Sequence, residues 1–80
     1  MPYPYEARLR ALKGKVWVRV LLDEQGRVQR SAVQFSSGSD VLDNAAVTAS
    51  VEVRLMPAMQ NGSAIPSQAL LMFDYAVEAP

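Results

Sequence analysis

The stretch KVWVRVLLDEQGRVQRSAVQFSS, residues 15–37, decides the fold of this chain. Valine occupies every second position at its start, and a period of two that is rich in β-branched residues is typical of a β-strand. The Asp-Glu-Gln-Gly sequence at 23–26 predicts a turn whose glycine can adopt a positive φ. A second strand is expected over about 27–35, and Val28 and Val33 can share one of its faces only across a bulge. The stretch therefore predicts a β-hairpin.

A short helix is predicted before this hairpin, over residues 4–12. Pro4 suits the first helical position, where its missing N–H costs nothing. Tyr5, Leu9 and Leu12 then fall on one face of a helix, as an amphipathic segment requires.

The stretch SSGSDVLDNAA, residues 36–46, has two possible interpretations. A serine-glycine run before a helix can bind phosphate, but this run lacks the Gly-Lys-Ser/Thr ending of a phosphate loop. Asp40 and Asp43 would also place carboxylates where the phosphate would sit. We therefore expect a helix with Asp40 as its N-cap and with Asp43 as the carboxylate that reaches back to the cap.

The end of this second helix is left open by the sequence. Residues 47–55, VTASVEVRL, alternate strictly and, taken alone, predict a strand. The aspartate cap and the alanine pairs favour a helix over the first two turns. Pro57 stops any helix, and Asn61-Gly62 predicts a turn beyond it.

The last predicted element is a long strand within residues 67–77, SQALLMFDYAV. The expected order is therefore helix, strand, strand, helix, strand. This order predicts an α+β protein, a two-layer sandwich in which a three-stranded antiparallel sheet of order 2-1-3 carries two helices on one face. Eighty residues allow one hydrophobic core, so we expect a single domain over 1–80 with its core at about 3–77.

The composition of the chain argues against several classes of function. The chain has neither cysteine nor histidine, and 8 basic and 8 acidic side chains give it a formal net charge of zero. A neutral balance argues against nucleic acid as a partner, because that partner needs a positive surface. Ser36, Ser37 and Ser39 have no imidazole to activate them, and the adjacent Asp23 and Glu24 predict an exposed turn rather than an acid–base pair. We therefore expect no enzyme, no metal site and no cofactor.

The final strand carries the most functional information. Between Ser67 and Val77 there is no proline, and Asp74 is the one charged residue. Natural proteins usually protect an exposed edge strand with charge or proline. Two alternatives follow: the strand is covered within the molecule, or it is a docking edge to which an extended peptide adds as a further strand.

A second feature is the opposite face of the sheet, away from the helices. Trp17, Leu21, Leu70 and Met72 are all expected on it. Such a cluster predicts either a contact surface for a partner or the interface of a homodimer.

Several segments together resemble a known family: YPYEA, GKVWVRVLLDEQGRV, SSGSDVLDNAA, PAMQNGSAIP and the closing apolar strand. In this order they are similar to the C-terminal domain of TonB, either of TonB itself or of a TonB-like paralogue. The resemblance extends from Tyr3 to about Tyr75. It implies that the opening residues of the second helix have an architectural role.

The resemblance implies a periplasmic energy-transducer domain of a protein that is anchored in the bacterial inner membrane. Proteins of this kind are powered by a proton-driven ExbB–ExbD complex, which would act through a preceding anchor and spacer. Their C-terminal domain binds the TonB box, a short peptide of outer-membrane receptors, by strand addition, and force then admits siderophore, haem or cobalamin. Carried over to this chain, the peptide-binding strand comprises Gln68, Ala69, Leu70, Leu71, Met72, Phe73 and Asp74. The alternative is a structural dimerisation module of a TonB/TolA-like envelope protein that acts through strand exchange.

Overall fold

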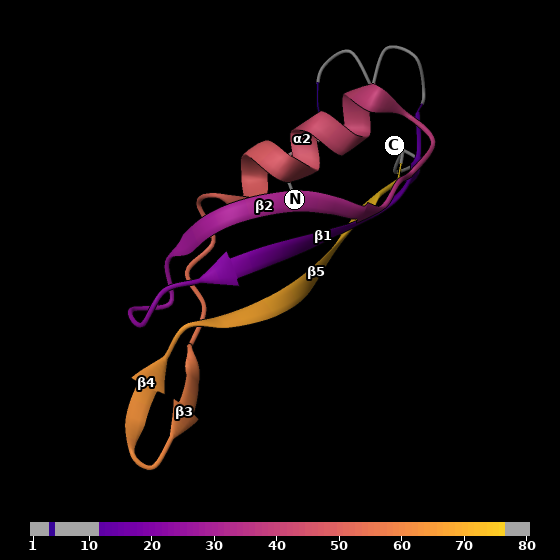
Figure 1. Ribbon diagram of the computed structural model, residues 1–80. Helices are drawn as coiled ribbons and strands as arrows, with labels where there is room; N and C mark the ends of the chain where they lie inside the picture. The colour runs from indigo at the N-terminus through magenta and orange to yellow at the C-terminus, as the bar shows by residue number, and fades with distance from the viewer. Residues whose placement is uncertain (1–3, 5–11, 77–80) are drawn as a thin grey trace.

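A computed structural model describes Pro4 and residues 12–76. In chain order the elements are β1 (Gly14–Leu22), β2 (Val28–Phe35), α2 (Asp40–Ser50), β3 (Ala58–Gln60), β4 (Ser63–Ile65) and β5 (Ser67–Tyr75). A three-stranded antiparallel sheet has the order β2-β1-β5, and α2 lies across one of its faces (Figure 1). The predicted α+β class and the predicted 2-1-3 order are therefore confirmed, with β5 as the third strand. The helix predicted over 4–12 lies, apart from its two ends, outside the described residues, so this N-terminal helix stays a prediction.

The predicted hairpin of β1 and β2 is confirmed, and it contains two irregularities. The register shifts once between Trp17 and Val18 and again between Leu21 and Leu22, which leaves Gln34 and Gln29 of β2 without opposite residues. Such extra residues are β-bulges, which bend a strand and increase its twist. The bulge at Gln29 gives Val28 and Val33 the common face that the sequence requires, because these residues lie opposite Leu22 and Val18.

The turn between β1 and β2 is fixed by Asp23. Its carboxylate accepts hydrogen bonds from the backbone N–H groups of Gln25 and Arg27, each at 2.9 Å. Gly26 adopts the predicted positive φ, here +78°. Its N–H donates to the Asp23 carbonyl, and its own carbonyl accepts from the Leu55 N–H at 3.0 Å. The turn is thus tied to the segment that follows α2.

The start of α2 differs from the prediction by one residue. The N-cap is Ser39, with an extended backbone and a side chain that accepts from the Leu42 N–H, and Asp40 is the first helical residue. Asp43 does reach back, but to Ser37 and Ser36 rather than to the cap. Its carboxylate accepts from the Ser37 N–H at 3.0 Å, from the Ser37 hydroxyl at 2.7 Å and from the Ser36 hydroxyl. The segment between β2 and α2 is therefore a hydrogen-bonded turn.

The open question about residues 47–55 is settled in favour of helix for the first part. Helix α2 continues to Ser50, with Val51 as its C-cap. Within the remaining residues, 51–55, strand geometry is limited to a single bridge between Arg54 and Arg27. Of the three valines in this stretch, Val47 therefore lies in the helix, Val51 caps it and Val53 lies beyond it.

A second hairpin, of β3 and β4, was not predicted. Asn61 and Gly62 have φ values of +51° and +80°. Positive φ at both central residues defines the turn that Asn-Gly favours between two strands. The dipeptide predicts the turn, but flanking strands of three residues each are too short to give a pattern. The predicted element order is therefore wrong here, and the hairpin extends beyond the end of the main sheet (Figure 1).

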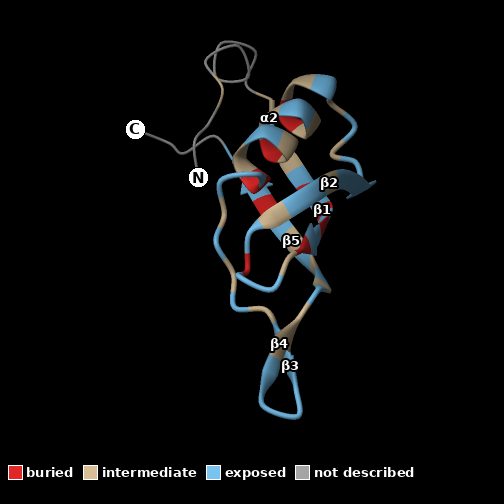
Figure 2. Ribbon diagram, turned by 60° about the vertical axis from the view of Figure 1, so that its left-hand side comes forward, coloured by how far each residue is buried: buried red, intermediate tan, exposed pale blue. Residues whose placement is uncertain are grey.

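The core lies between the sheet and α2, and the buried residues of the sheet face those of α2 (Figure 2). Its fully or nearly fully buried members are Val16, Val18, Val20, Leu22, Leu42, Ala46, Phe73 and Tyr75. Ser50 is the one buried polar residue among those described. Its hydroxyl oxygen lies 2.8 Å from that of Ser31 and donates to the Val47 carbonyl at 2.7 Å. This pair joins the last turn of α2 to β2, and its hydrogen bonds satisfy the buried hydroxyl.

Candidate functional site

Strand β5 forms one edge of the main sheet. All nine of its residues are in register with β1, from Ser67 opposite Leu22 to Tyr75 opposite Gly14, without a bulge. Within the described part of the chain no strand pairs with its other side. The residues that the family resemblance implies for peptide binding all lie in this strand: Gln68, Ala69, Leu70, Leu71, Met72, Phe73 and Asp74.

The helix gives β5 less cover than it gives the other strands. Helix α2 packs mainly on β1 and β2 and makes a smaller contact with β5. Burial accordingly rises along β5: Ala69 and Leu71 are half-buried, whereas Phe73 and Tyr75 are buried. The carboxyl end of β5 therefore belongs to the core, and its first half is held mainly by pairing with β1.

The outer face of the sheet, opposite α2, carries an exposed apolar cluster. The predicted members Trp17, Leu21, Leu70 and Met72 are 36%, 38%, 48% and 38% exposed, and Phe35 of β2 joins them at 57%. We call these five residues the outer-face patch. Phe35 was missed by the sequence analysis, because the bulge at Gln34 decides that it lies opposite Trp17.

Basic side chains lie among these apolar ones. Lys15, Arg19 and Arg30 accompany the patch on β1 and β2, and Asp74 is the acidic residue of the same face on β5. Within the described residues neither Arg19 nor Arg30 makes an ion pair or a side-chain hydrogen bond. The outer face therefore has an excess of positive charge although the whole chain is neutral.

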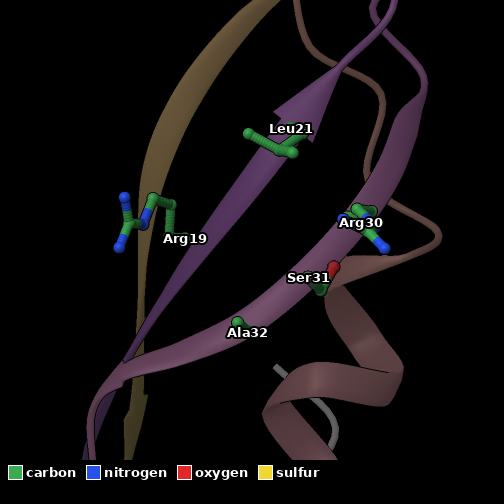
Figure 3. Close-up of a pocket in the computed structure, with 5 residues that line it drawn as sticks. All are labelled: Arg19, Leu21, Arg30, Ser31 and Ala32. Atoms are coloured by element: carbon green, nitrogen blue, oxygen red, sulfur yellow. The ribbon is translucent and has the colours of Figure 1, made fainter.

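Arg19 borders two shallow hollows of this face. One, of about 500 Å³, is lined by Arg19, Leu21, Arg30, Ser31 and Ala32 (Figure 3). The other, of about 350 Å³, reaches across the sheet from Gln34 and Phe35 to Gln68, Ala69 and Leu70. Both have the size of small-ligand sites, but their lining is a strand surface rather than a convergent set of polar groups.

The acidic residues that the sequence singled out have structural roles. The Asp23 carboxylate accepts from Arg27 Nε at 3.0 Å and from Gln29 Nε2 at 2.9 Å. The backbone hydrogen bond from Arg27 is the largest of the interactions that lower the pKa of Asp23. Partial burial would raise the pKa of Asp43, but the hydrogen bonds from Ser36 and Ser37 outweigh it and lower that pKa. In the described ranges no three acidic side chains come together as a possible metal site.

Helix α2 has 11 residues, and no helical segment in the part of the chain that the structure describes can span a bilayer.

Comparisons with known proteins agree on one family. The family model described as the Gram-negative bacterial TonB protein C-terminal matches residues 1–77. The solution structure of the Pseudomonas aeruginosa TonB C-terminal domain is similar at 28% identity and a TM-score of 0.79, over 99% of this chain and 80% of that one. The corresponding Helicobacter pylori domain has 22% identity and a TM-score of 0.75, over 99% and 71%, and shows the common fold. No curated protein sequence matches the chain.

The family is one of periplasmic, transport-related domains without catalytic function, and its members interact with outer-membrane receptors. The sheet order, the single described helix over one face and the match over 77 of the 80 residues agree with this assignment. The chain belongs to the TonB C-terminal domain family.

Proposed function

We propose that this domain binds the TonB-box peptide of outer-membrane receptors by adding the peptide as a strand to β5. In this proposal the domain transmits force that derives from the proton motive force of the inner membrane. A protein anchored there and powered by ExbB–ExbD would pull on the receptor and so admit siderophore, haem or cobalamin. Membership of the TonB C-terminal family supports this role.

The observation that carries the proposal is the regular outer edge of β5. The strand is continuous over Ser67–Tyr75, it contains no proline, and Asp74 is its one charged residue. A sheet edge of this kind presents unpaired N–H and C=O groups to another chain. Since these groups belong to the main chain, receptors with different side chains can use the same edge.

The expected affinity is modest. Five to seven paired residues form about 4–6 backbone hydrogen bonds, each worth roughly 0.5–1.5 kcal/mol net. Ordering the peptide offsets part of this gain, so we expect reversible binding with a Kd on the order of micromolar. Reversibility suits a module that has to engage and release its receptor.

An NMR titration tests the proposal. The ¹⁵N-labelled 80-residue chain is titrated with a capped TonB-box heptapeptide, and the same peptide with proline at its central position serves as the matched control. We expect the amide shifts to concentrate in Gln68–Asp74 and the proline peptide to bind much more weakly, because it lacks one donor and its ring obstructs pairing. Shifts that leave Gln68–Asp74 unchanged would contradict the proposal.

A second candidate function is a homodimer formed through the same edge. The exposed outer-face patch favours it, since five large apolar side chains would gain from burial between two copies. Sedimentation over a range of concentrations separates the two functions. A chain that stays monomeric at millimolar concentration has no such dimer.

A further inference from the structure

The antiparallel register arranges the outer face of the sheet in rows that cross all three strands. One row runs Phe35–Trp17–Met72, the next Ala32–Arg19–Leu70, and the third Arg30–Leu21–Gln68. A strand added to β5 places one further residue at the end of each row, because side chains of one face alternate with a period of two. The rows differ in chemistry, so each prefers a different residue in the added strand.

The middle row contains an unpaired positive charge. Arg19 makes no ion pair and no side-chain hydrogen bond within the described residues. Its neighbours in the row, Ala32 and Leu70, are uncharged. The acidic residue of this face, Asp74, lies opposite Lys15 and four residues along β5 from Leu70. Arg19 therefore has no acidic side chain next to it on the sheet.

Arg19 is also directed towards the open edge. Its side chain extends from β1 on the side of β5 (Figure 3), and it shares the hollow of about 350 Å³ with Gln68, Ala69 and Leu70. A strand docked on β5 would lie about 10 Å from β1, which is two strand spacings. An arginine and a glutamate that lean towards each other over Leu70 span this separation. Leu70, 48% exposed, forms the floor beneath them.

The neighbouring row is apolar throughout. Phe35, Trp17 and Met72 are each partly exposed, at 57%, 36% and 38%. An apolar side chain at the end of this row extends the cluster and removes surface from water.

We propose that this domain selects peptides by an acidic residue opposite Leu70, which pairs with Arg19, and an apolar residue two positions away, opposite Met72. The selection rests on the strand addition proposed above and concerns the outward-facing side chains of the added strand. Arg30 cannot replace Arg19, because it lies on β2, one strand further from the open edge.

Three capped heptapeptides test this selection. Each has threonine at positions 1, 3, 5 and 7 and valine at positions 2 and 6, and position 4 is glutamate, glutamine or lysine. The pattern reads the same in both directions, so it does not depend on the orientation of the added strand. The Kd of each peptide for the 80-residue chain is measured from the β5 amide shifts.

We expect the glutamate peptide to bind about two- to five-fold more tightly than the glutamine peptide, as an exposed ion pair allows, and the lysine peptide to bind most weakly. Arg19→Gln should remove the difference between glutamate and glutamine without abolishing binding. Arg19→Glu should reverse the preference in favour of lysine. Arg30→Gln is the matched control and should keep the glutamate preference.

The outcomes separate this inference from the proposed function. Equal binding of the three peptides at β5 would overturn the selection and leave strand addition standing. Loss of the glutamate preference in Arg30→Gln as much as in Arg19→Gln would also overturn it, because the cause would then be the general charge of the face. If no peptide shifts the β5 amides, both the selection and strand addition fail.

Discussion

The main sheet has two edges, and they are built differently. Strand β2 has two bulges, at Gln29 and Gln34, and its pairing with β1 shifts register at each. Strand β5 pairs with β1 over nine consecutive residues without interruption. Bulges twist an edge away from a straight partner, whereas a regular edge continues the sheet. The irregular edge of β2 is therefore poorly suited to pairing with a further strand, whereas the regular edge of β5 is suited to it.

The two edge strands also differ in how they are held. Six of the eight residues of β2 are exposed, and the strand is fastened at its ends, by the Asp23 turn and by the serines that bind Asp43. Strand β5 instead buries Phe73 and Tyr75 in the core at its carboxyl end. The open edge thus lies on a strand that the core itself holds in place.

The largest expected effect comes from the same substitution in the two strands. Phe73→Ala should destabilise the fold by about 3–5 kcal/mol, because it empties part of the core. Phe35→Ala should cost less than about 1 kcal/mol, since that ring is 57% exposed. Urea unfolding followed by circular dichroism measures both. Equal losses would mean that β5 is not the strand held by the core.

The next largest loss of stability is expected at Gly26, in the turn that precedes β2. A Cβ on Gly26 would lie 1.6 Å from the Leu55 carbonyl oxygen, and φ is +78°. We expect Gly26→Ala to cost about 3 kcal/mol, from strain and from the displaced backbone. Gly38 is the matched control, with φ of +90° and no atom within 4 Å of an added Cβ. Gly38→Ala should cost only about 1–2 kcal/mol, the strain of a left-handed residue. If both variants lose the same stability in urea unfolding, the contact with Leu55 has no role.

A lysine introduced next to Arg19 on either edge strand compares the two edges again, with a smaller expected change in free energy. Leu70 and Ala32 both lie opposite Arg19, one on each edge strand. Leu70→Lys should weaken the heptapeptide with central glutamine, described above, about five-fold, from the loss of roughly 1 kcal/mol of apolar contact. Ala32→Lys should leave this Kd unchanged, because it lies at the other edge. The NMR titration measures both, and equal weakening would show that charge rather than position controls binding.

The smallest effect is expected at Asp43, which accepts hydrogen bonds from the serines that follow β2. The pKa of Asp43 is lowered from its ordinary value of 3.8. The unfolded chain therefore binds the proton more tightly than the folded one. The stabilisation by this carboxylate is present above about pH 4 and is lost as the pH falls through the folded pKa.

Asp43→Asn should remove this part of the acid dependence. Urea unfolding between pH 2 and 6 would show a flatter loss of stability towards low pH in the variant than in the parent chain. An unchanged slope would mean that the serine hydrogen bonds do not stabilise the ionised carboxylate.

Local chemistry predicted much of the fold. Alternating valines, the Gly26 turn and the capped start of α2 are short-range signals, and the structure has all three elements. The N-cap moved by one residue because Ser39 and Asp40 are both good caps, and only the geometry of the turn chooses between them. The β3–β4 hairpin stayed hidden because three-residue strands have too little sequence to show alternation.

The sequence also predicted part of the candidate site, again from short-range patterns. The β5 residues and four members of the outer-face patch follow from simple alternation. Phe35 does not, because its place depends on the bulge at Gln34, and a bulge reverses the faces of all later residues. The position of Arg19 opposite Leu70 depends on the register between β1 and β5, which alternation alone does not give. The open edge depends on strand order, which the sequence suggested and the structure confirmed.

The most direct test of the account is amide hydrogen exchange of the two edge strands, measured residue by residue with and without a capped TonB-box heptapeptide. The account predicts that the outward-pointing amides of β5, which exchange fast in the free chain, slow by at least about ten-fold when the peptide is saturating, since each then donates to the added strand. The amides of β2 should keep their rates. Protection that appears on β2, or outward β5 amides that are already slow in the free monomer, would contradict it.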